Sequence, residues 1–436
     1  MRKYEGFMKD VQVYLIFMQK LTIVEFKQRR RSEIILLVSL GILIHLPFLI
    51  WDLIFQGNNP LFKGWDNGDL RAYKARAQAI LDGEFFNTVV WINPNQFIPG
   101  FGAAPLINYL FVPLAPFSFT PFAFECYFVL WNILTTILIA EILRIHGFPL
   151  KKRLLGALFY LFNPIVILNA TWILTDESIT VFFIILPFYL QKKGIRWAIG
   201  SLIIGFYVKF LSIILLPIFL IEAARCDASI IQESFFALLL LVLIGTPFFL
   251  TTLESNTLQL PKSWSTGNDQ SEGYAPIRIF LKTFDYPVYG YIKFSFLLLF
   301  LLGLMIFLKI SWRHNLNILV MSGFTVLLWF FMTWHWFLEY FAYILPFFAL
   351  IFLNRSNNSP NHPSPLFPAD FTFRHFLLLF LLSEGLLFLS QWAVWNIGYE
   401  IPLLIITLGG FSLLTYTWLE LVSCFFFNNS SETQNK

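Results

Sequence analysis

The sequence predicts an all-α polytopic membrane protein, with about twelve transmembrane helices and a large first exported loop that carries short surface helices. Of its 436 residues, 57% are hydrophobic and 13% are charged, whereas soluble domains contain roughly 25% charged residues. Apolar runs of about 20 residues recur along the chain, as in membrane-spanning helices. These runs do not alternate in polarity, as the strands of a membrane β-barrel would.

The N-terminal segment 1–32 is basic and amphipathic. Residues 11–26 are apolar but interrupted by charges, so we expect an interfacial helix there. Arg29, Arg30 and Arg31 precede the first span, 34–55, and hold the N-terminus in the cytoplasm. Residues 56–119 are then exported.

The first exported loop contains Asp66 and Asp69, separated by an Asn-Gly turn. A short amphipathic helix is expected over 70–81, closed by Asp82-Gly83. A return rich in Pro, Gly and Asn follows, and then an apolar stretch, 107–114, that is too short to span. A loop of this length is more often functional than idle.

The remaining spans alternate with basic or polar loops. They are expected at 121–145, 154–168, 176–190, two halves of 197–222, 230–250, 288–308, 316–333, 337–353, 376–394 and 401–427. Thr175 is a candidate cap for the span 176–190. A second exported loop covers 253–287, a cytoplasmic loop covers 354–373 between the module 33–353 and the C-terminal helices 374–427, and 428–436 form a polar tail.

The segment 197–222 is long enough for one helix, but the distribution of charge favours a hairpin. A single span would place the polar loop 253–287 in the cytoplasm and Lys309 and Arg313 outside. A break near 209–212 restores positive charge on the cytoplasmic side throughout. We therefore predict two short helices.

With this topology, four polar groups of residues lie at the exported face. They are Asp66 with Asp69, Asp176 with Glu177, the loop 253–287, and the segment 334–340 around His335. Their convergence indicates a functional site on that face.

At these positions the chain resembles the GT-C superfamily, multi-spanning glycosyltransferases that use polyprenyl-phosphate sugars as donors. The resemblance covers about 60–350. It rests on Gly68-Asp69-Leu70-Arg71-Ala72-Tyr73 with Ala79 to Gly83, Asn163-Pro164 with Asp176, Gly200-Ser201 to Lys209 with Leu216-Pro217, and His335, Trp336, Tyr340 and Leu345-Pro346. The most similar branch uses polyprenyl-phosphate mannose, such as dolichyl-phosphate mannose.

The resemblance implies inverting transfer of one hexose, with mannose expected, to a lipid, glycan or protein acceptor on the non-cytoplasmic side. It carries the catalytic aspartate over to Asp69, through its place before Tyr73. Asp66 departs from a strict Asp-x-Asp pair, so the choice of base between Asp66 and Asp69 stays open. Inverting transfer needs one base for the acceptor hydroxyl and cations for the departing phosphate. No Gly-rich nucleotide loop is present in the sequence.

Each further candidate has a structural alternative. Asp176 and Glu177 act as a second acid that orients the acceptor, or they are N-terminal helix acids favoured by the dipole by about 0.3–1 kcal/mol. Lys209 contacts the donor phosphate, or it snorkels to the surface. His335 contacts phosphate or sugar, or belongs to an interfacial belt. Arg71 and Tyr73 are candidates for donor binding, with headgroup contact as the alternative for Arg71.

No cofactor is required by the sequence, although Asp66, Asp69, Asp176 and Glu177 would together suit one divalent cation. The expected partners are the lipid-linked donor, the acceptor and membrane lipids, with no nucleic acid. The membrane is either the plasma membrane or the endoplasmic reticulum. A secondary transporter and a non-catalytic membrane subunit of a larger complex are the alternative functions. A transporter would show ionisable residues near the midplane and internal repeats.

Overall fold

The computed structural model describes residues 28, 30–51, 53–54, 68–86, 89–93, 96–99, 105–254, 289–313, 316–332, 342–355 and 382. The expected interfacial helix 11–26, the residues 255–287 of the second exported loop, the segment 334–340 and the spans 376–394 and 401–427 lie outside these ranges.

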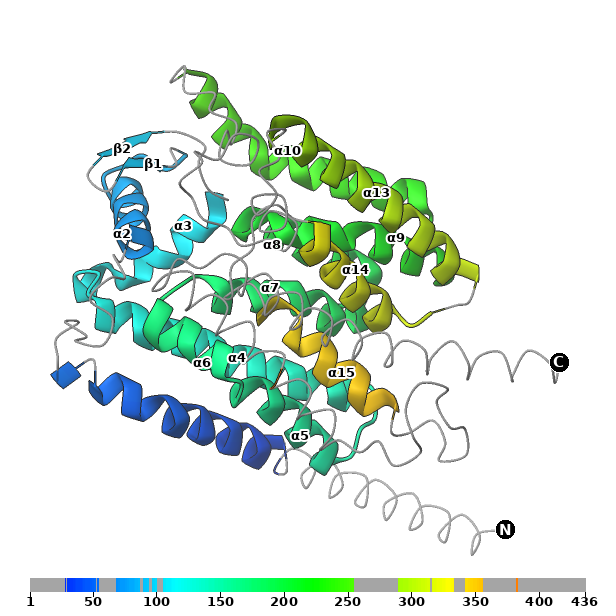
Figure 1. Cartoon of the computed structure of the whole chain (residues 1–436), viewed down its shortest axis with the longest axis horizontal. Helices are drawn as coiled ribbons and strands as arrows, with labels where there is room; N and C mark the ends of the chain where they lie inside the picture. The colour runs from blue at the N-terminus through cyan, green and yellow to red at the C-terminus, as the bar shows by residue number, and fades with distance from the viewer. Residues whose placement is uncertain are drawn as a thin grey trace, which may run out of the picture.

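The described part is a stack of helices, of which α4 to α10 are joined by short turns (Figure 1). The first helix runs over Arg30–Trp51. It is followed by α2 (Gly68–Leu81), α3 (Pro105–Phe111), α4 (Pro121–Ile145), α5 (Leu150–Leu161), α6 (Pro164–Leu168), α7 (Glu177–Leu190), α8 (Ile195–Val208), α9 (Leu216–Arg225), α10 (Ile230–Glu254), α13 (Tyr289–Arg313), α14 (Ile318–Met332) and α15 (Leu345–Arg355). In the stack, α7 lies between α4 and α8, and α10 packs on the other side of α8.

Several of these helices have the length and composition of membrane spans. Within the described residues, three qualify singly: Arg30–Trp51, Pro121–Ile145 and Ile230–Leu250. A bent pair brings the number to four if it counts as one span. The outward faces of α10 and α13 expose large apolar side chains such as Phe235 and Met305, which lipid would cover. The chain is therefore a helical integral membrane protein, and the expected number of about twelve spans remains a prediction.

The first exported loop adds one pair of strands to the predicted helical fold. Besides α2, which begins and ends close to the predicted bounds, the loop forms a two-stranded antiparallel sheet of β1 (Val89–Asn93) and β2 (Gln96–Pro99). Val89 is opposite Pro99, and Asn93 is opposite Gln96. The run Val-Val-Trp-Ile is rich in β-branched and aromatic residues, which favour strands. The short surface helices expected in this loop are present as α2 and α3, whereas the strand pair was not predicted.

The predicted span 154–168 is two helices instead of one. α5 and the continuous segment Pro164–Ile173 meet at an angle of 53°. The break falls at Asn163-Pro164, because the residue before a proline is restricted to extended conformations. Asn163 then caps α6 by accepting a hydrogen bond from the Ile165 N–H at 2.9 Å.

The predicted hairpin in 197–222 is confirmed. α8 ends at Val208, a turn of 3₁₀ helix covers Phe210–Leu215, and α9 follows. The chain reverses direction between α8 and α9. This is seen in the hydrogen bond that Gln191, just before α8, donates to Glu222, near the end of α9, at 3.1 Å. Arg225 then donates to the carbonyls of Ser311 and Leu316, so the end of α9 lies beside the α13–α14 turn.

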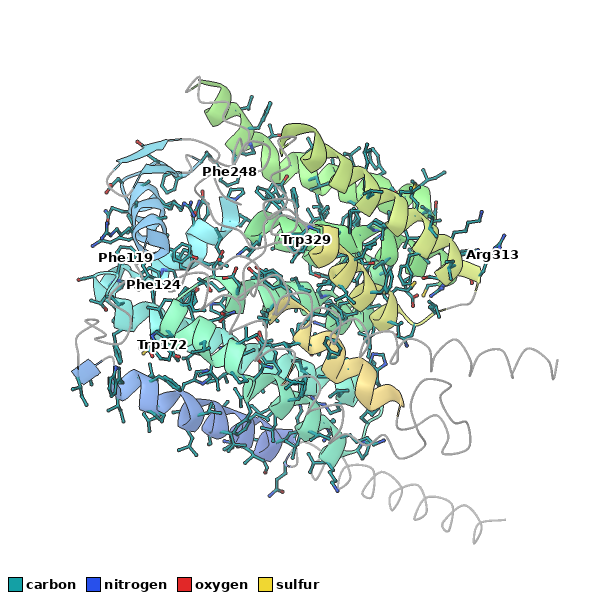
Figure 2. All side chains as sticks on the ribbon, viewed as in Figure 1. Phe119, Phe124, Trp172, Phe248, Arg313 and Trp329 are labelled. Carbon is teal, nitrogen blue, oxygen red and sulfur yellow. The ribbon has the colours of Figure 1, made fainter. Side chains whose placement is uncertain are left out.

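Basic residues gather at one end of the stack. Arg153 forms an ion pair with Glu33 at 2.7 Å, and Arg30 pairs with Glu141 at 3.1 Å. Figure 2 shows Arg313 at one side of the molecule and Phe119, Phe124 and Trp172 at the opposite side. The described chain thus has one end rich in basic side chains and one that carries the polar groups described below.

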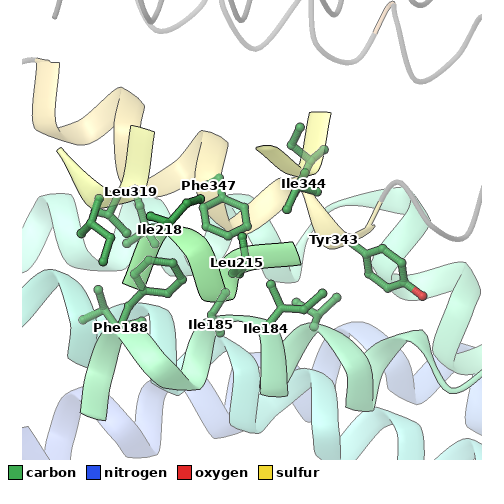
Figure 3. Close-up of a cluster of buried hydrophobic side chains, with 14 of the residues drawn as sticks. Ile184, Ile185, Phe188, Leu215, Ile218, Leu319, Tyr343, Ile344 and Phe347 are labelled. Atoms are coloured by element: carbon green, nitrogen blue, oxygen red, sulfur yellow. The ribbon is translucent and has the colours of Figure 1, made fainter. Parts of the chain in front are cut away.

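The core between these ends is apolar. Figure 3 shows side chains of α7, α9, α14 and α15 packed together, including Ile185, Ile218, Leu319 and Phe347. Tyr343 lies at the edge of this cluster, with its hydroxyl directed away from the aliphatic side chains. This core fixes the ends of α7 and α8 relative to the chain before α15.

Candidate functional site

Five side chains from four distant segments meet at the end opposite the basic residues. We call Tyr73, Asp176, Glu177, Lys209 and Tyr343 the Lys209 cluster. The Lys209 Nζ lies 2.9 Å from Asp176 Oδ1 and also contacts Glu177 Oε1. The side chain of Glu177 is 2% exposed and that of Lys209 is 25% exposed. The cluster is therefore largely buried but remains accessible at the lysine.

An irregular turn positions Asp176 and Glu177 at the start of α7. A π-helical turn covers Asn169–Ile173, and Leu174 follows in the left-handed region, with φ of 58°. Such a φ is uncommon for a bulky residue, and π turns often mark functional sites. The Thr175 N–H closes the turn by bonding to the Asn169 carbonyl at 3.2 Å. The chain then enters α7 with Asp176 and Glu177 side by side.

The expected role of Thr175 as the helix cap was wrong. Asp176 occupies the N-cap position of α7, and its side chain makes no capping hydrogen bond. The π turn shifts the register, which places Thr175 before the cap. The carboxylate of Asp176 is therefore directed to Tyr73 and Lys209 rather than to its own helix.

The break between α8 and the following 3₁₀ turn positions Lys209. Lys209 has extended backbone angles, φ −154° and ψ 126°, and its N–H bonds to the Gly205 carbonyl at 2.8 Å. The absence of a side chain at Gly205 permits the close approach of the two halves of the hairpin. A Cβ at this position would lie 2.9 Å from Ser212 Oγ and 3.3 Å from Phe183 Cβ. A side chain at position 205 would push the two halves of the hairpin apart.

Each acid also has a tyrosine partner. The Tyr73 hydroxyl donates to Asp176 Oδ1 at 3.2 Å and accepts from the Asp176 N–H at 3.2 Å. Its ring stacks on Phe111, with centroids 4.4 Å apart. The buried Tyr343 hydroxyl donates to Glu177 Oε1 at 2.9 Å. The tyrosines hold the carboxylates independently of the lysine.

The formal charge of the cluster is −1, because two carboxylates face one ammonium group. Buried charges are stabilised only when they are paired and hydrogen-bonded. The arrangement satisfies this condition while leaving an excess of negative charge. It can accept hydrogen bonds from a hydroxyl ligand, and it can exchange the lysine for another cation or offer it to an anion.

The structure brings together four of the residues predicted from the sequence: Tyr73, Asp176, Glu177 and Lys209. Arg71 is exposed on α2, two positions before Tyr73. Asp69 belongs to the first turn of α2, but its side chain is outside the described part, as are Asp66 and His335.

Sequence reasoning missed Tyr343. The residue stands two positions before Leu345-Pro346, which the sequence had marked, but aromatic residues make up 19% of the chain. At that frequency, no single tyrosine is distinguished by its type alone. Only the fold brings its hydroxyl to Glu177.

Within the described ranges, no group of three or more His, Cys, Asp or Glu side chains is suited to a metal ion. The divalent cation considered above would need Asp66 or Asp69 beside Asp176 and Glu177, and their side chains fall outside those ranges. The cation therefore remains a prediction.

The fold and the cluster define a multi-span helical membrane protein with a partly accessible ionic site at one end. No protein-family model matches the chain, and no curated protein matches it. Among solved structures, it is similar to a crystal structure of ArnT from Cupriavidus metallidurans bound to undecaprenyl phosphate. The TM-score is 0.44, the sequence identity is 11%, and the match covers 88% of this chain and 77% of that chain.

Proposed function

We propose that the chain is an inverting glycosyltransferase that moves a hexose, with mannose expected, from a polyprenyl-phosphate donor to an acceptor hydroxyl. The acceptor is a lipid, a glycan or a protein. The observation that carries the proposal is the hydrogen bond between Tyr73 of the first exported loop and Asp176 at the start of α7. It joins two of the sequence regions on which the resemblance to GT-C glycosyltransferases depends.

The catalytic base in this proposal is Asp69, with Asp66 as the alternative. Position 69 is one helical turn before Tyr73 on α2, and residues four apart lie on the same face of a helix. A base near the Tyr73 end of the Lys209 cluster would be close to any acceptor held there. It would take the hydroxyl proton as the acceptor oxygen attacks the anomeric carbon, and the lipid phosphate would leave.

Asp176 and Glu177 orient the acceptor in this scheme. An ionised carboxylate acts only as a hydrogen-bond acceptor, and the carboxylates of Asp176 and Glu177 are held by Tyr73 and Tyr343. A sugar or lipid hydroxyl is a suitable donor to them. The tyrosine hydroxyls also fix the direction of each carboxylate before the ligand arrives.

Lys209 contacts the donor phosphate by exchanging its partners. Because the ligand-free cluster is already negative, an incoming phosphate competes with Asp176 and Glu177 for the ammonium group. The two tyrosines allow this exchange, since each acid keeps a hydrogen-bond donor when Lys209 turns away. Arg71 and His335 are further candidates for phosphate or sugar contacts, Arg71 from the exposed face of α2.

The reaction takes place on the non-cytoplasmic face. The cluster lies at the start of α7, and the basic turn Gln191–Lys193 follows the other end of that helix. Positive loops are retained in the cytoplasm, which supports the exported side for the cluster. The membrane is the plasma membrane or the endoplasmic reticulum.

The experiment that tests the proposal is transfer of labelled sugar from dolichyl- or undecaprenyl-phosphate mannose by the purified full-length protein. Asp69→Asn should abolish transfer, and Asp82→Asn, in the exposed turn just after the same helix, is the matched control. Loss in Asp66→Asn alone would keep the reaction and move the base. A folded wild-type protein that is inert with mannose, glucose and galactose donors would refute the proposal and favour a transporter or a non-catalytic subunit.

A further inference from the structure

A buried amide in α4 contacts the chain just ahead of the acids. Asn132 is 1% exposed. Its Nδ2 donates to the Val166 carbonyl of α6 at 2.9 Å, and its Oδ1 accepts from the Tyr160 hydroxyl of α5 at 3.3 Å. A single side chain therefore ties three helices together through both ends of its amide group.

The carbonyl that Asn132 binds is at a change of helix type. Val166 lies in α6, and the π turn Asn169–Ile173 begins immediately after that helix. There the hydrogen-bond spacing widens by one residue. The Val166 carbonyl accepts from the Asn169 N–H, and the Asn132 amide is its second donor. A side-chain donor from a neighbouring helix stabilises such a junction.

From this junction the chain runs directly to the Lys209 cluster. Thr171 donates to the Ile167 carbonyl at 2.8 Å, and the Thr175 N–H bonds to Asn169 at 3.2 Å. These bonds make the turn a closed unit, so a shift of Val166 moves Asp176 with it. The Asn132 amide makes its hydrogen bonds to Val166 and Tyr160, and its effect on Asp176 passes through the backbone of the turn.

Thr136, one turn further along α4, shows what a purely local polar contact looks like. Its hydroxyl is buried as well, but it donates to the Asn132 carbonyl of its own helix at 2.8 Å. The Asn132 amide differs, because both of its partners belong to other helices and one of them is main chain at the π junction.

We infer that Asn132, supported by Tyr160, is a positioning residue: it sets the π turn that aims Asp176 and Glu177 at Lys209. Its bearing on transfer depends on the proposed function, but its effect on the geometry of the cluster does not. Without the amide donor, the Val166 carbonyl keeps only the Asn169 N–H, and the turn relaxes toward regular helix. Asp176 and Glu177 then rotate away, and Lys209 loses its ion pairs.

The test is competitive labelling of lysines with acetic anhydride in the full-length protein in lipid nanodiscs, read by mass spectrometry. Lys192, which is exposed at the basic end, serves as the internal reference. Asn132→Leu and Tyr160→Phe should each raise the labelling of Lys209 relative to Lys192 several-fold, with Asn132→Leu the larger. Thr136→Val, the matched loss of a buried hydroxyl, should leave the ratio unchanged.

An unchanged ratio in folded Asn132→Leu would overturn the inference, and so would an equal rise in all three variants. If Asn132→Leu does not fold, Tyr160→Phe decides the matter, because it removes a single oxygen. In the transfer assay both variants should lower kcat and leave the KM for the donor lipid unchanged. A wild-type protein without transfer activity would refute the proposed function while leaving the labelling result valid.

Discussion

The Lys209 ammonium group and the Asp176 carboxylate lie 2.9 Å apart, although one belongs to the break after α8 and the other to the cap of α7. Lys209 also contacts Glu177, so a single cation joins two adjacent acids. These ion pairs connect α7 to the end of α8, and substitutions at them should change stability and lipid binding in measurable ways.

Lys209→Met should destabilise the protein. Removing one partner of a buried ion pair typically costs about 3–5 kcal/mol, because the remaining charge is uncompensated. We expect the lower end, since Lys209 is 25% exposed. Thermal unfolding in detergent measures the loss, and Lys192→Met, an exposed lysine, is the control.

The same unfolding experiment has an internal check. In Lys209→Met, adding Glu177→Gln should restore part of the stability, because the most buried charge is removed with its partner. If the double variant is no more stable than Lys209→Met, the ion pair is not the source of the loss.

Glu177→Gln should bind an anionic polyprenyl lipid more tightly than the wild type. The substitution raises the formal charge of the cluster from −1 to 0, given its two acids and one lysine, and reduces competition for the ammonium group. Titration of undecaprenyl phosphate into the protein in nanodiscs measures the affinity.

Lys209→Met should weaken the same binding, because the cluster then carries only acids. Lys192→Met is the control for Lys209→Met, and Glu84→Gln, in the exposed turn after α2, is the control for Glu177→Gln, because each pair changes the net charge equally. Weaker binding in Glu177→Gln would contradict the exchange of partners at Lys209.

Gly205→Ala should disturb the hairpin. Its Cβ would lie 2.9 Å from Ser212 Oγ, and overpacking of this kind costs about 1–3 kcal/mol. Gly200→Ala, on the same helix, is the matched control, because the nearest atom to its Cβ is Leu240 Cδ1 at 3.8 Å. Unfolding midpoints that fall equally in both variants would show that the close approach at Gly205 is not what matters.

Tyr73→Phe and Tyr343→Phe should each lower transfer about tenfold, equivalent to roughly 1.4 kcal/mol in the barrier. Each variant removes one hydroxyl group that donates a hydrogen bond to a carboxylate, and it keeps the aromatic ring. Steady-state rates with the labelled donor measure the effect. Tyr127→Phe, whose hydroxyl donates to the Leu110 carbonyl instead, should retain most of the activity.

Much of the architecture followed from the sequence. The bounds of α4 agree with the predicted span, and α2 with the predicted surface helix. The hairpin was predicted from the distribution of Lys and Arg and is confirmed by Gln191 and Glu222. These features depend on local hydropathy and charge, which a single sequence carries directly.

The sequence was less informative where the backbone departs from regular helix. The π turn at Asn169–Ile173 and the left-handed Leu174 had no signal in residue type. The sequence predicts an irregular return where β1 and β2 form, because these two short strands lie around a turn rich in Pro and Asn. In each case a distant contact or a cross-strand partner selects the conformation.

The sequence by itself determined that this is a helical membrane protein, where its charged ends lie, and that Tyr73, Asp176, Glu177 and Lys209 merit attention. Only the tertiary structure decided that these four meet, that Tyr343 joins them, and that Lys209 is shared between two acids. The physical reason is range. Hydropathy and capping act over neighbouring residues, whereas the cluster depends on helices packed together from segments far apart in the chain.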